Sequence, residues 1–223
     1  MEAILDRQPW GMLEPHLARV GTDVAVAMAR LRAYAKLLLE WNRGYSNLIS
    51  RNDEDRIVER HLAESLEPAH WLKDGDHKRW LDLGSGGGLP AVPLIVAGVG
   101  ESWTLVESRR NKTLFLRKVI GELGIQSVSV ELGRLEMLDT PEDAARLGRF
   151  DGFTSRATMK LVPTLALAAR WVVAGGASYL WKGSRLQEEV EQDKSWERSW
   201  RPDGGLGLRS GPTVVARFIR TDE

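Results

Sequence analysis

The segment from Asp82 to Gly88, which reads Asp-Leu-Gly-Ser-Gly-Gly-Gly, is the feature that most constrains the fold of this chain. It follows a short apolar run over 80–83 and precedes a segment with Pro90 and Pro93, residues that suit the first turn of a helix. Glycine tolerates a positive φ and lets a ligand approach the backbone closely. A loop of this kind between a strand and a helix is typical of nucleotide binding at the carboxyl edge of an open α/β sheet.

The rest of the chain alternates between apolar runs and helical patterns. We predict strands over 80–83, 103–106, 128–132, 150–154, 177–181 and 213–219, and helices from about 89, over 109–123 and over 161–173. This alternation predicts a Rossmann-like parallel sheet with helices on both faces. The stretch over 195–211, rich in Gly, Pro and Trp, is predicted to hold an antiparallel hairpin at one edge.

The first third of the chain has helical periodicity. Apolar residues recur every three or four positions from Val24 to Tyr45, and Thr22 or Asp23 can cap this helix. Trp41 and Tyr45 are expected in the core by that spacing. A second helix is predicted over 55–72, with Pro68 in its last turn. We therefore expect a helical extension over 1–72, packed on a Rossmann-like domain over 73–223.

Composition excludes several kinds of site. The 223 residues include no cysteine, which excludes disulfides, a thiolate nucleophile and cysteine-ligated metals. The four histidines show no spacing that suggests a metal site, so we predict none. No apolar run is long enough to span a membrane, and the first residues lack the pattern of a secretory signal, so a cytoplasmic protein is expected. The formal net charge is zero, so binding to nucleic acid would need a local basic patch.

The residues around the loop are compatible with two kinds of ligand, a nicotinamide dinucleotide and S-adenosylmethionine. Glu107 ends the second predicted strand, where an acid can accept hydrogen bonds from both hydroxyls of a ribose. Gly84, Gly86 and Gly88 form G-x-G-x-G, but a dinucleotide motif, G-x-G-x-x-A, also fits from Gly86 onward. Asp82 suits an ammonium group and would repel a pyrophosphate, which favours S-adenosylmethionine. A nicotinamide-dependent oxidoreductase remains the alternative.

Six ordered motifs resemble one family, the small-subunit ribosomal RNA guanine-N7 methyltransferases, also called glucose-inhibited division protein B. The resemblance runs from about Leu37 to Gly183 and rests on these segments: Leu38 to Ser50, Arg60 to Leu66, Leu81 to Pro93, Val106 to Arg117, Phe150 to Ala157, and Trp181 to Gly183. Gly87 and Ala91 depart from the commonest family residues, and the segment after Lys182 follows the family loosely.

The resemblance implies a class I methyltransferase fold, with S-adenosylmethionine as the methyl donor. It implies guanine N7 in the 530 loop of 16S ribosomal RNA as the methyl acceptor. The cofactor site predicted from the loop and from the resemblance together consists of Asp82, Gly84, Gly86, Gly88, Leu89, Glu107, Leu135, Glu136 and Arg156. The resemblance also implies a site role for Asn47 and His61.

The chemistry of this acceptor limits which residues are needed. Guanine N7 has a free lone pair and no proton, so no general base is required and we assign no catalytic residue; positioning supplies the rate. Lys182 could reach O6 of the base, and Arg109 and Arg110 begin a basic run that could contact RNA phosphates. A methyltransferase of small molecules would not need that run and stays a second alternative. Because the net charge is zero, we expect weak binding to naked RNA and predict 16S ribosomal RNA within a small-subunit particle as the substrate. We also expect a monomer.

Overall fold

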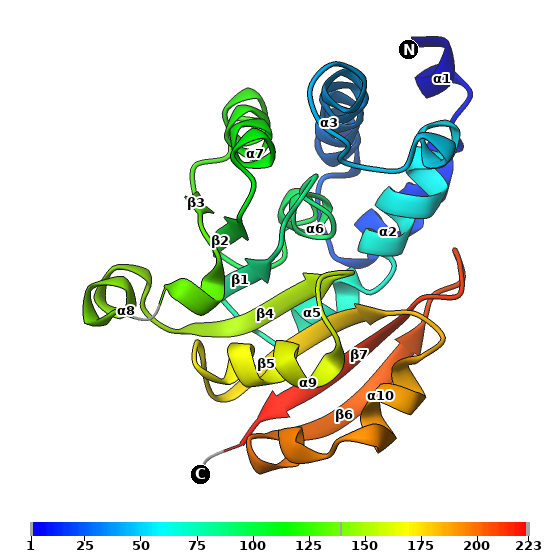
Figure 1. Ribbon diagram of the computed structural model, residues 1–223. Helices are drawn as coiled ribbons and strands as arrows, with labels where there is room; N and C mark the ends of the chain where they lie inside the picture. Colours follow the sequence, from blue (N-terminus) through cyan, green and yellow to red (C-terminus); the bar gives the residue numbers. More distant parts are fainter. Residues whose placement is uncertain (1, 139, 222–223) are drawn as a thin grey trace.

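The computed structural model describes residues 2–138 and 140–221 of the chain. Within them the strands form one seven-stranded sheet in the order β3-β2-β1-β4-β5-β7-β6 (Figure 1). The strands are β1 (Arg79–Leu83), β2 (Ser102–Glu107), β3 (Val128–Leu132), β4 (Phe150–Arg156), β5 (Val172–Lys182), β6 (Trp200–Gly207) and β7 (Val214–Arg220). β1 to β5 are parallel, and β7 is antiparallel to both β5 and β6.

Helices cover both faces of this sheet, as Figure 1 shows. Alternate side chains of each strand point to opposite faces: Trp80 packs in one apolar cluster with α3, α6 and α7, whereas Leu81 packs in another with α9. The helices after the first strand are α6 (Ala91–Val96), α7 (Arg110–Glu122), η4 (Leu135–Met137), α8 (Pro141–Leu147), α9 (Leu161–Ala169), α10 (Leu186–Gln192) and η5 (Ser195–Arg198).

The N-terminal helices share the core of the sheet and also contact the glycine loop. They are α1 (Glu2–Asp6), η1 (Trp10–Leu13), α2 (Glu14–Arg19), α3 (Val24–Gly44), η2 (Arg51–Arg56), η3 (Val58–Ala63), α4 (Glu64–Leu66) and α5 (Ala69–Asp74). Asp23 caps α3 by accepting a hydrogen bond from the Val26 N–H. The hydroxyl of Tyr34, in the middle of α3, donates to the Gly87 carbonyl at 2.6 Å. The glycine loop is therefore supported by the N-terminal helices. None of the helices in the described part of the chain is long and apolar enough to cross a bilayer.

The second predicted helix, over 55–72, is wrong as a continuous element. The chain instead passes through the 3₁₀ turn η2, the π-helix η3 and the single turn α4 before α5 begins at Ala69. Pro68 has no N–H to continue the helical hydrogen bonds, which separates α4 from α5. π-helical turns occur often at functional sites, and η3 carries His61 toward the glycine loop.

Two predictions near the C-terminus also need correction. The helix predicted over 161–173 ends at Ala169, and β5 begins at Val172 rather than at 177. The pairing of β4 with β5 shifts register between Phe150 and Gly152, and Gly175 takes a φ of 78°, so this part of β5 lacks the regular alternation that marks a strand. The antiparallel edge is a β6–β7 pair, with η5 before it, rather than a hairpin within 195–211.

At one strand position, Gly152, an aromatic ring leaves no room for a side chain. A Cβ added at Gly152 would lie 2.4 Å from the ring of Trp80, which is fully buried and stacks on Trp103. We expect Gly152→Ala to lower the free energy of unfolding by about 1–3 kcal/mol, as overpacked cores do, measured by urea denaturation. Gly207→Ala, in a strand position with nothing within 4 Å, is the matched control and should change stability little. Equal stability of the two variants would contradict the prediction.

Candidate cofactor and substrate site

Three adjacent cavities lie at the carboxyl edge of the parallel strands. The β2 cavity, of about 300 Å³, is bounded by the ends of β1 and β2 and by the segment Gly133 to Glu136. The loop cavity, of about 330 Å³, lies over the glycine loop against Leu48, Ile49 and His61. The β5 cavity, of about 530 Å³, lies past the end of β4 and reaches Lys182. Thr158 lines all three, so they form one continuous region of the edge.

The glycines of the loop have the conformations that the sequence predicts. Gly84, Gly86 and Gly88 have φ values of 69°, 53° and 85°, which L side chains rarely adopt. A Cβ at Gly84 would lie 2.3 Å from the Thr158 methyl group, so this position needs glycine for a second reason. Gly84 and Gly86 line the cavities, whereas Gly88 packs on Val92 of α6 and shapes the loop from behind.

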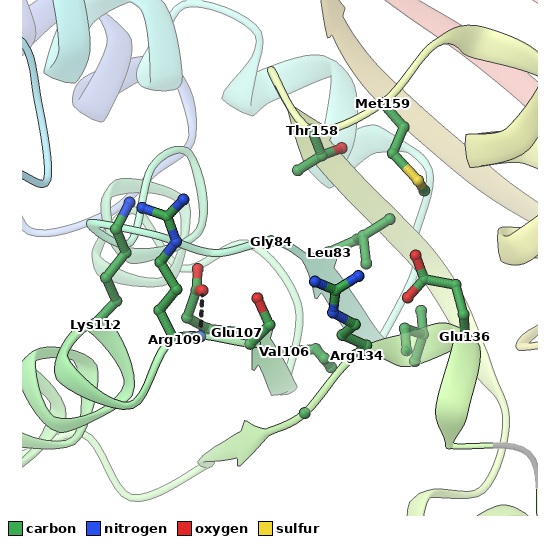
Figure 2. Close-up of a pocket in the computed structure, with 13 residues that line it drawn as sticks. Leu83, Gly84, Val106, Glu107, Arg109, Lys112, Arg134, Glu136, Thr158 and Met159 are labelled. Atoms are coloured by element: carbon green, nitrogen blue, oxygen red, sulfur yellow. Dashed lines mark hydrogen bonds between the residues drawn. The ribbon is translucent and has the colours of Figure 1, made fainter.

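Glu107 is the acid that the structure brings into the β2 cavity. Its side chain is largely buried, and its Oε2 accepts a hydrogen bond from the Gly86 N–H at 2.9 Å. Its Oε1 accepts from the Arg109 N–H at 2.8 Å, the bond drawn in Figure 2. Each carboxylate oxygen can accept more than one hydrogen bond. Glu107 thus fixes the glycine loop and still offers acceptors to a ribose diol.

Asp82 lies under the loop rather than in a cavity wall. It is 1% exposed, and its Oδ1 accepts from the Thr154 hydroxyl at 2.6 Å. Its Oδ2 is buried and has no hydrogen-bond partner among the described residues. Burial raises the pKa of Asp82 to about 6. The Asp82 carboxyl is buried and lines none of the three cavities. The structure therefore does not show the direct contact with an ammonium group that we predicted.

The wall facing Glu107 comes from the segment after β3. Leu135 and Glu136 both line the β2 cavity; the side chain of Leu135 is buried and that of Glu136 is exposed. Figure 2 shows Arg134 between Glu107 and Glu136, and Lys112 and Arg109 beyond Glu107. Arg134, Lys112, Thr158 and Met159 also line this cavity and were missing from the predicted site. Only Lys112 carried a sequence signal, since it belongs to the basic run.

Arg156 and His61 meet in a buried polar cluster between β4 and η3. The Arg156 Nη2 donates to Glu64 Oε2 at 2.7 Å and lies 3.3 Å from His61 Nδ1. Glu64 is 1% exposed; burial raises its pKa, and burial lowers the pKa of Arg156. The His61 Nε2 faces Asp53 at 3.6 Å. Arg156 lines the loop and β5 cavities and not the β2 cavity, so it lies on the side away from Glu136.

The pKa values of His61 and Asp82 shift in opposite directions, which predicts two opposite pH profiles. Burial, aided by the charge of Arg156, lowers the pKa of His61 from 6.5 to about 4, so the unfolded state binds more protons between pH 6.5 and 4. Burial raises the pKa of Asp82 to about 6, so the folded state binds more protons between pH 6 and 4. By linkage, each effect is on the order of 3 kcal/mol.

Single variants should separate the two profiles. In Asp82→Asn, the remaining His61 effect lowers the free energy of unfolding as the pH falls from 6.5 to 4. In His61→Gln, the remaining Asp82 effect raises it as the pH falls from 6 to 4. Urea denaturation of both variants across this range measures the difference, in which the contributions of other carboxylates cancel. Parallel profiles for the two variants would show that neither group titrates as described.

The substrate candidates are dispersed. Lys182 lines the β5 cavity, but its Nζ donates to Glu189 at 2.8 Å and to the Met159 carbonyl at 2.9 Å. Its charge is therefore neutralised by Glu189. Asn47 is exposed and outside the three linings. Arg109 lines the β2 cavity, whereas Arg110 is exposed and lines none of the three. Leu89 and His61 line the loop cavity.

Asn42, which follows Trp41 at the end of α3, has a structural role that the sequence analysis did not predict. The Asn42 side-chain oxygen accepts from the Leu48 N–H at 2.6 Å and from the Ile49 N–H at 3.0 Å, which shapes the wall of the loop cavity. Tyr45 was expected in the core and is 71% exposed, because α3 ends at Gly44 and the chain turns away. Trp41 is half-buried against Phe115.

Comparison with known proteins identifies the family. The family model described as rRNA small subunit methyltransferase G matches residues 27–199. A protein of that name from Stenotrophomonas maltophilia is 37% identical over 186 residues, covering 83% of this chain and 82% of the relative. A protein of the same name from Pseudomonas aeruginosa is 39% identical over 183 residues, covering 78% and 79%.

Solved structures support the fold. A mutant of MtNAS in complex with S-adenosylmethionine superposes with a TM-score of 0.57 at 15% identity, covering 96% of this chain and 98% of that one. The pre-rRNA processing protein fibrillarin from Methanococcus jannaschii superposes with a TM-score of 0.52 at 15% identity, covering 66% and 67%. The predicted class I fold is confirmed, and the oxidoreductase and small-molecule alternatives are set aside. The chain belongs to the rRNA small subunit methyltransferase G family and is an S-adenosylmethionine-dependent methyltransferase.

Proposed function

We propose that the protein transfers a methyl group from S-adenosylmethionine to N7 of one guanine in the 530 loop of 16S ribosomal RNA. The observation that carries the proposal is the composition of the β2 cavity in a chain of this family. Its walls combine the Gly84 backbone, the carboxylate of Glu107 and the pair Leu135 and Glu136. In this proposal the Gly84 backbone faces the amino-acid end of the cofactor, Glu107 holds its ribose, and Leu135 and Glu136 flank its adenine.

The residues present fit this cofactor. Gly84 and Gly86 have positive φ values and line the β2 and loop cavities, so a ligand can lie against their main chain. Glu107 keeps acceptor capacity for two hydroxyls, and the buried Leu135 offers an apolar surface to a base. When bound, S-adenosylmethionine supplies a methyl group on a positively charged sulfur.

The residues of this chain need to position the guanine, but they do not need to activate it. N7 attacks in one displacement step without losing a proton, so an approach of about 3–3.5 Å in line with the methyl group is the main requirement. Thr158 and Met159 lie in the wall between the β2 and β5 cavities, where a base entering the edge would be held. His61 stays neutral at pH 7 because its pKa is about 4, so it adds no cation beside the charge that develops on the base.

The nature of the RNA partner follows from charge. Arg109, Arg110 and Lys112 form a local basic patch at the start of α7 on a chain with zero net charge. We therefore propose a small-subunit particle, whose proteins add binding surface, rather than naked RNA as the substrate. An enzyme acting on such a particle works in the cytoplasm, where ribosomal subunits are found.

The test is mass mapping of methylated guanines after incubation with labelled cofactor. Naked 16S ribosomal RNA and small-subunit particles from cells that lack this methylation are compared. One N7-methylguanine in the 530 loop, formed faster in particles, is the expected result. A methyl group on another base or another atom would refute the substrate assignment, and faster methylation of naked RNA would refute the choice of particle.

A further inference from the structure

The β5 cavity carries a local excess of positive charge. Five of its lining residues are cations: Arg60, Arg156, Lys160, Lys182 and Arg185. Two are acids, Glu64 and Glu189. The whole chain has 31 basic and 31 acidic residues, so this imbalance is a property of the cavity and not of the composition. A cavity of about 530 Å³ with this charge fits an anionic group.

The two acids form ion pairs with three of the cations. Glu189 pairs with Lys182 at 2.8 Å and also accepts from the Leu161 N–H at 2.6 Å. Glu64 pairs with Arg156 at 2.7 Å and lies 3.4 Å from Arg60. These pairs connect β4, β5, η3, α4 and α10 and are part of the fold.

Lys160 and Arg185 differ from those cations. Both side chains are exposed, and among the described residues neither forms an ion pair with a carboxylate. Arg185 only lies near Glu189, whose pKa it helps to lower. Lys160 immediately precedes α9, and Arg185 immediately precedes α10, so two separate loops bring them to one cavity. Their charges are free to meet a ligand.

The position of the cavity relates it to the RNA. It shares Thr158 and Met159 with the β2 cavity, and Arg156 and Ala157 with the loop cavity. A guanosine inserted with its base beside Thr158 carries one backbone phosphate on each side. The β5 cavity is the adjoining cationic space at this edge, within a nucleotide's reach of the base.

We propose that Lys160 and Arg185 bind a backbone phosphate next to the target guanosine in the β5 cavity; this inference rests on the proposed function. Phosphate contacts fix the register of a bound nucleic acid without reading its sequence. An arginine can hold a phosphate through two parallel hydrogen bonds, and a lysine adds a point charge. The two residues therefore position the RNA and do not touch the transferred methyl group.

The experiment compares the double variant Lys160→Gln/Arg185→Gln with the wild type and with Lys194→Gln/Arg198→Gln. The control removes the same charges from exposed positions at η5, before β6 at the opposite edge of the sheet. Methyl transfer from labelled S-adenosylmethionine to unmethylated small-subunit particles is measured between 50 and 200 mM KCl. Binding of S-adenosylhomocysteine by calorimetry checks that each variant keeps its cofactor site.

The test variant should raise KM for the particle by about tenfold or more, with kcat within about twofold. The slope of log KM against log salt should become shallower by about 0.7, since the neutralisation of one single-stranded phosphate contributes about 0.7. An unchanged KM or slope, or an equal change in the control, overturns the inference while methylation itself stands. Loss of S-adenosylhomocysteine binding in the test variant also overturns it, because Lys160 and Arg185 would then support the cofactor site. A wild-type enzyme that leaves guanine N7 unmodified refutes the proposed function instead, so the two failures are distinct.

Discussion

Glu107→Ala is expected to weaken binding of S-adenosylhomocysteine by about 100-fold. The substitution removes the acceptor of two proposed charge-assisted hydrogen bonds from the ribose hydroxyls, each contributing about 1.5 kcal/mol or more. A loss of about 3 kcal/mol corresponds to an affinity about 100-fold lower. The Gly86 and Arg109 N–H groups lose their acceptor as well, so the loop is no longer held in its binding shape. Isothermal titration calorimetry measures the dissociation constant directly.

Two further variants make this result specific. Glu107→Gln keeps the side-chain volume and one oxygen acceptor, so its affinity should lie between those of the wild type and the alanine variant. Glu101→Ala removes an exposed carboxylate that pairs with Lys78 and should leave affinity unchanged. An alanine variant at Glu107 that binds within about threefold of the wild type would show that the carboxylate does not hold the ribose.

Breaking the buried pair between Glu64 and Arg156 should cause the largest loss of stability in the molecule. We expect Glu64→Leu and Arg156→Met each to lower the free energy of unfolding by about 3–5 kcal/mol, because each leaves an uncompensated charge in the interior. Glu64 is almost completely buried, and its Oε1 has only Arg60 nearby as a substitute partner at 3.4 Å. Urea denaturation at pH 7.5 measures both variants.

The double variant separates loss of the pair from loss of packing. With both charges removed, much of the lost stability should return, because an apolar pair of similar volume has no desolvation penalty. Removing the exposed pair of Lys118 and Glu122 is the control, and it should change stability by less than about 1 kcal/mol. Single variants at Glu64 and Arg156 that lose less than about 1 kcal/mol would contradict this account.

Local signals made the central part of the fold predictable from sequence. The loop from Asp82 to Gly88 and the apolar runs around it identified β1 to β4. They also placed Glu107 at the end of β2, where it lines the β2 cavity. The helix around Tyr34 was also regular enough to predict. These features depend on periodicity and on glycine conformation, which a sequence shows directly.

The rest depended on contacts between distant segments. The burial of Asp82 follows from Thr154 on a neighbouring strand, and the neutralisation of Lys182 follows from Glu189 on a later helix. Neither partner has a sequence pattern that marks it. The interruption of the helix between Arg51 and Asp74 includes a π-helix, which has no simple hydrophobic period. Thr158 and Met159 were not predicted because they lie in a loop that has no sequence motif. Thr158 lines all three cavities, and Met159 lines the β2 and β5 cavities.

The hydrogen bond from Tyr34 to the Gly87 carbonyl has a consequence for how this enzyme can be engineered. The donor is in the N-terminal helices and the acceptor is in the cofactor loop, and Asn42 and Leu48 extend the same support along the loop cavity. The sheet with its own helices is therefore not an autonomous catalytic module. A fragment trimmed to begin just before β1, or a chimera that exchanges the first helices for unrelated ones, would retain the motif yet lack the scaffold that holds its glycines in place.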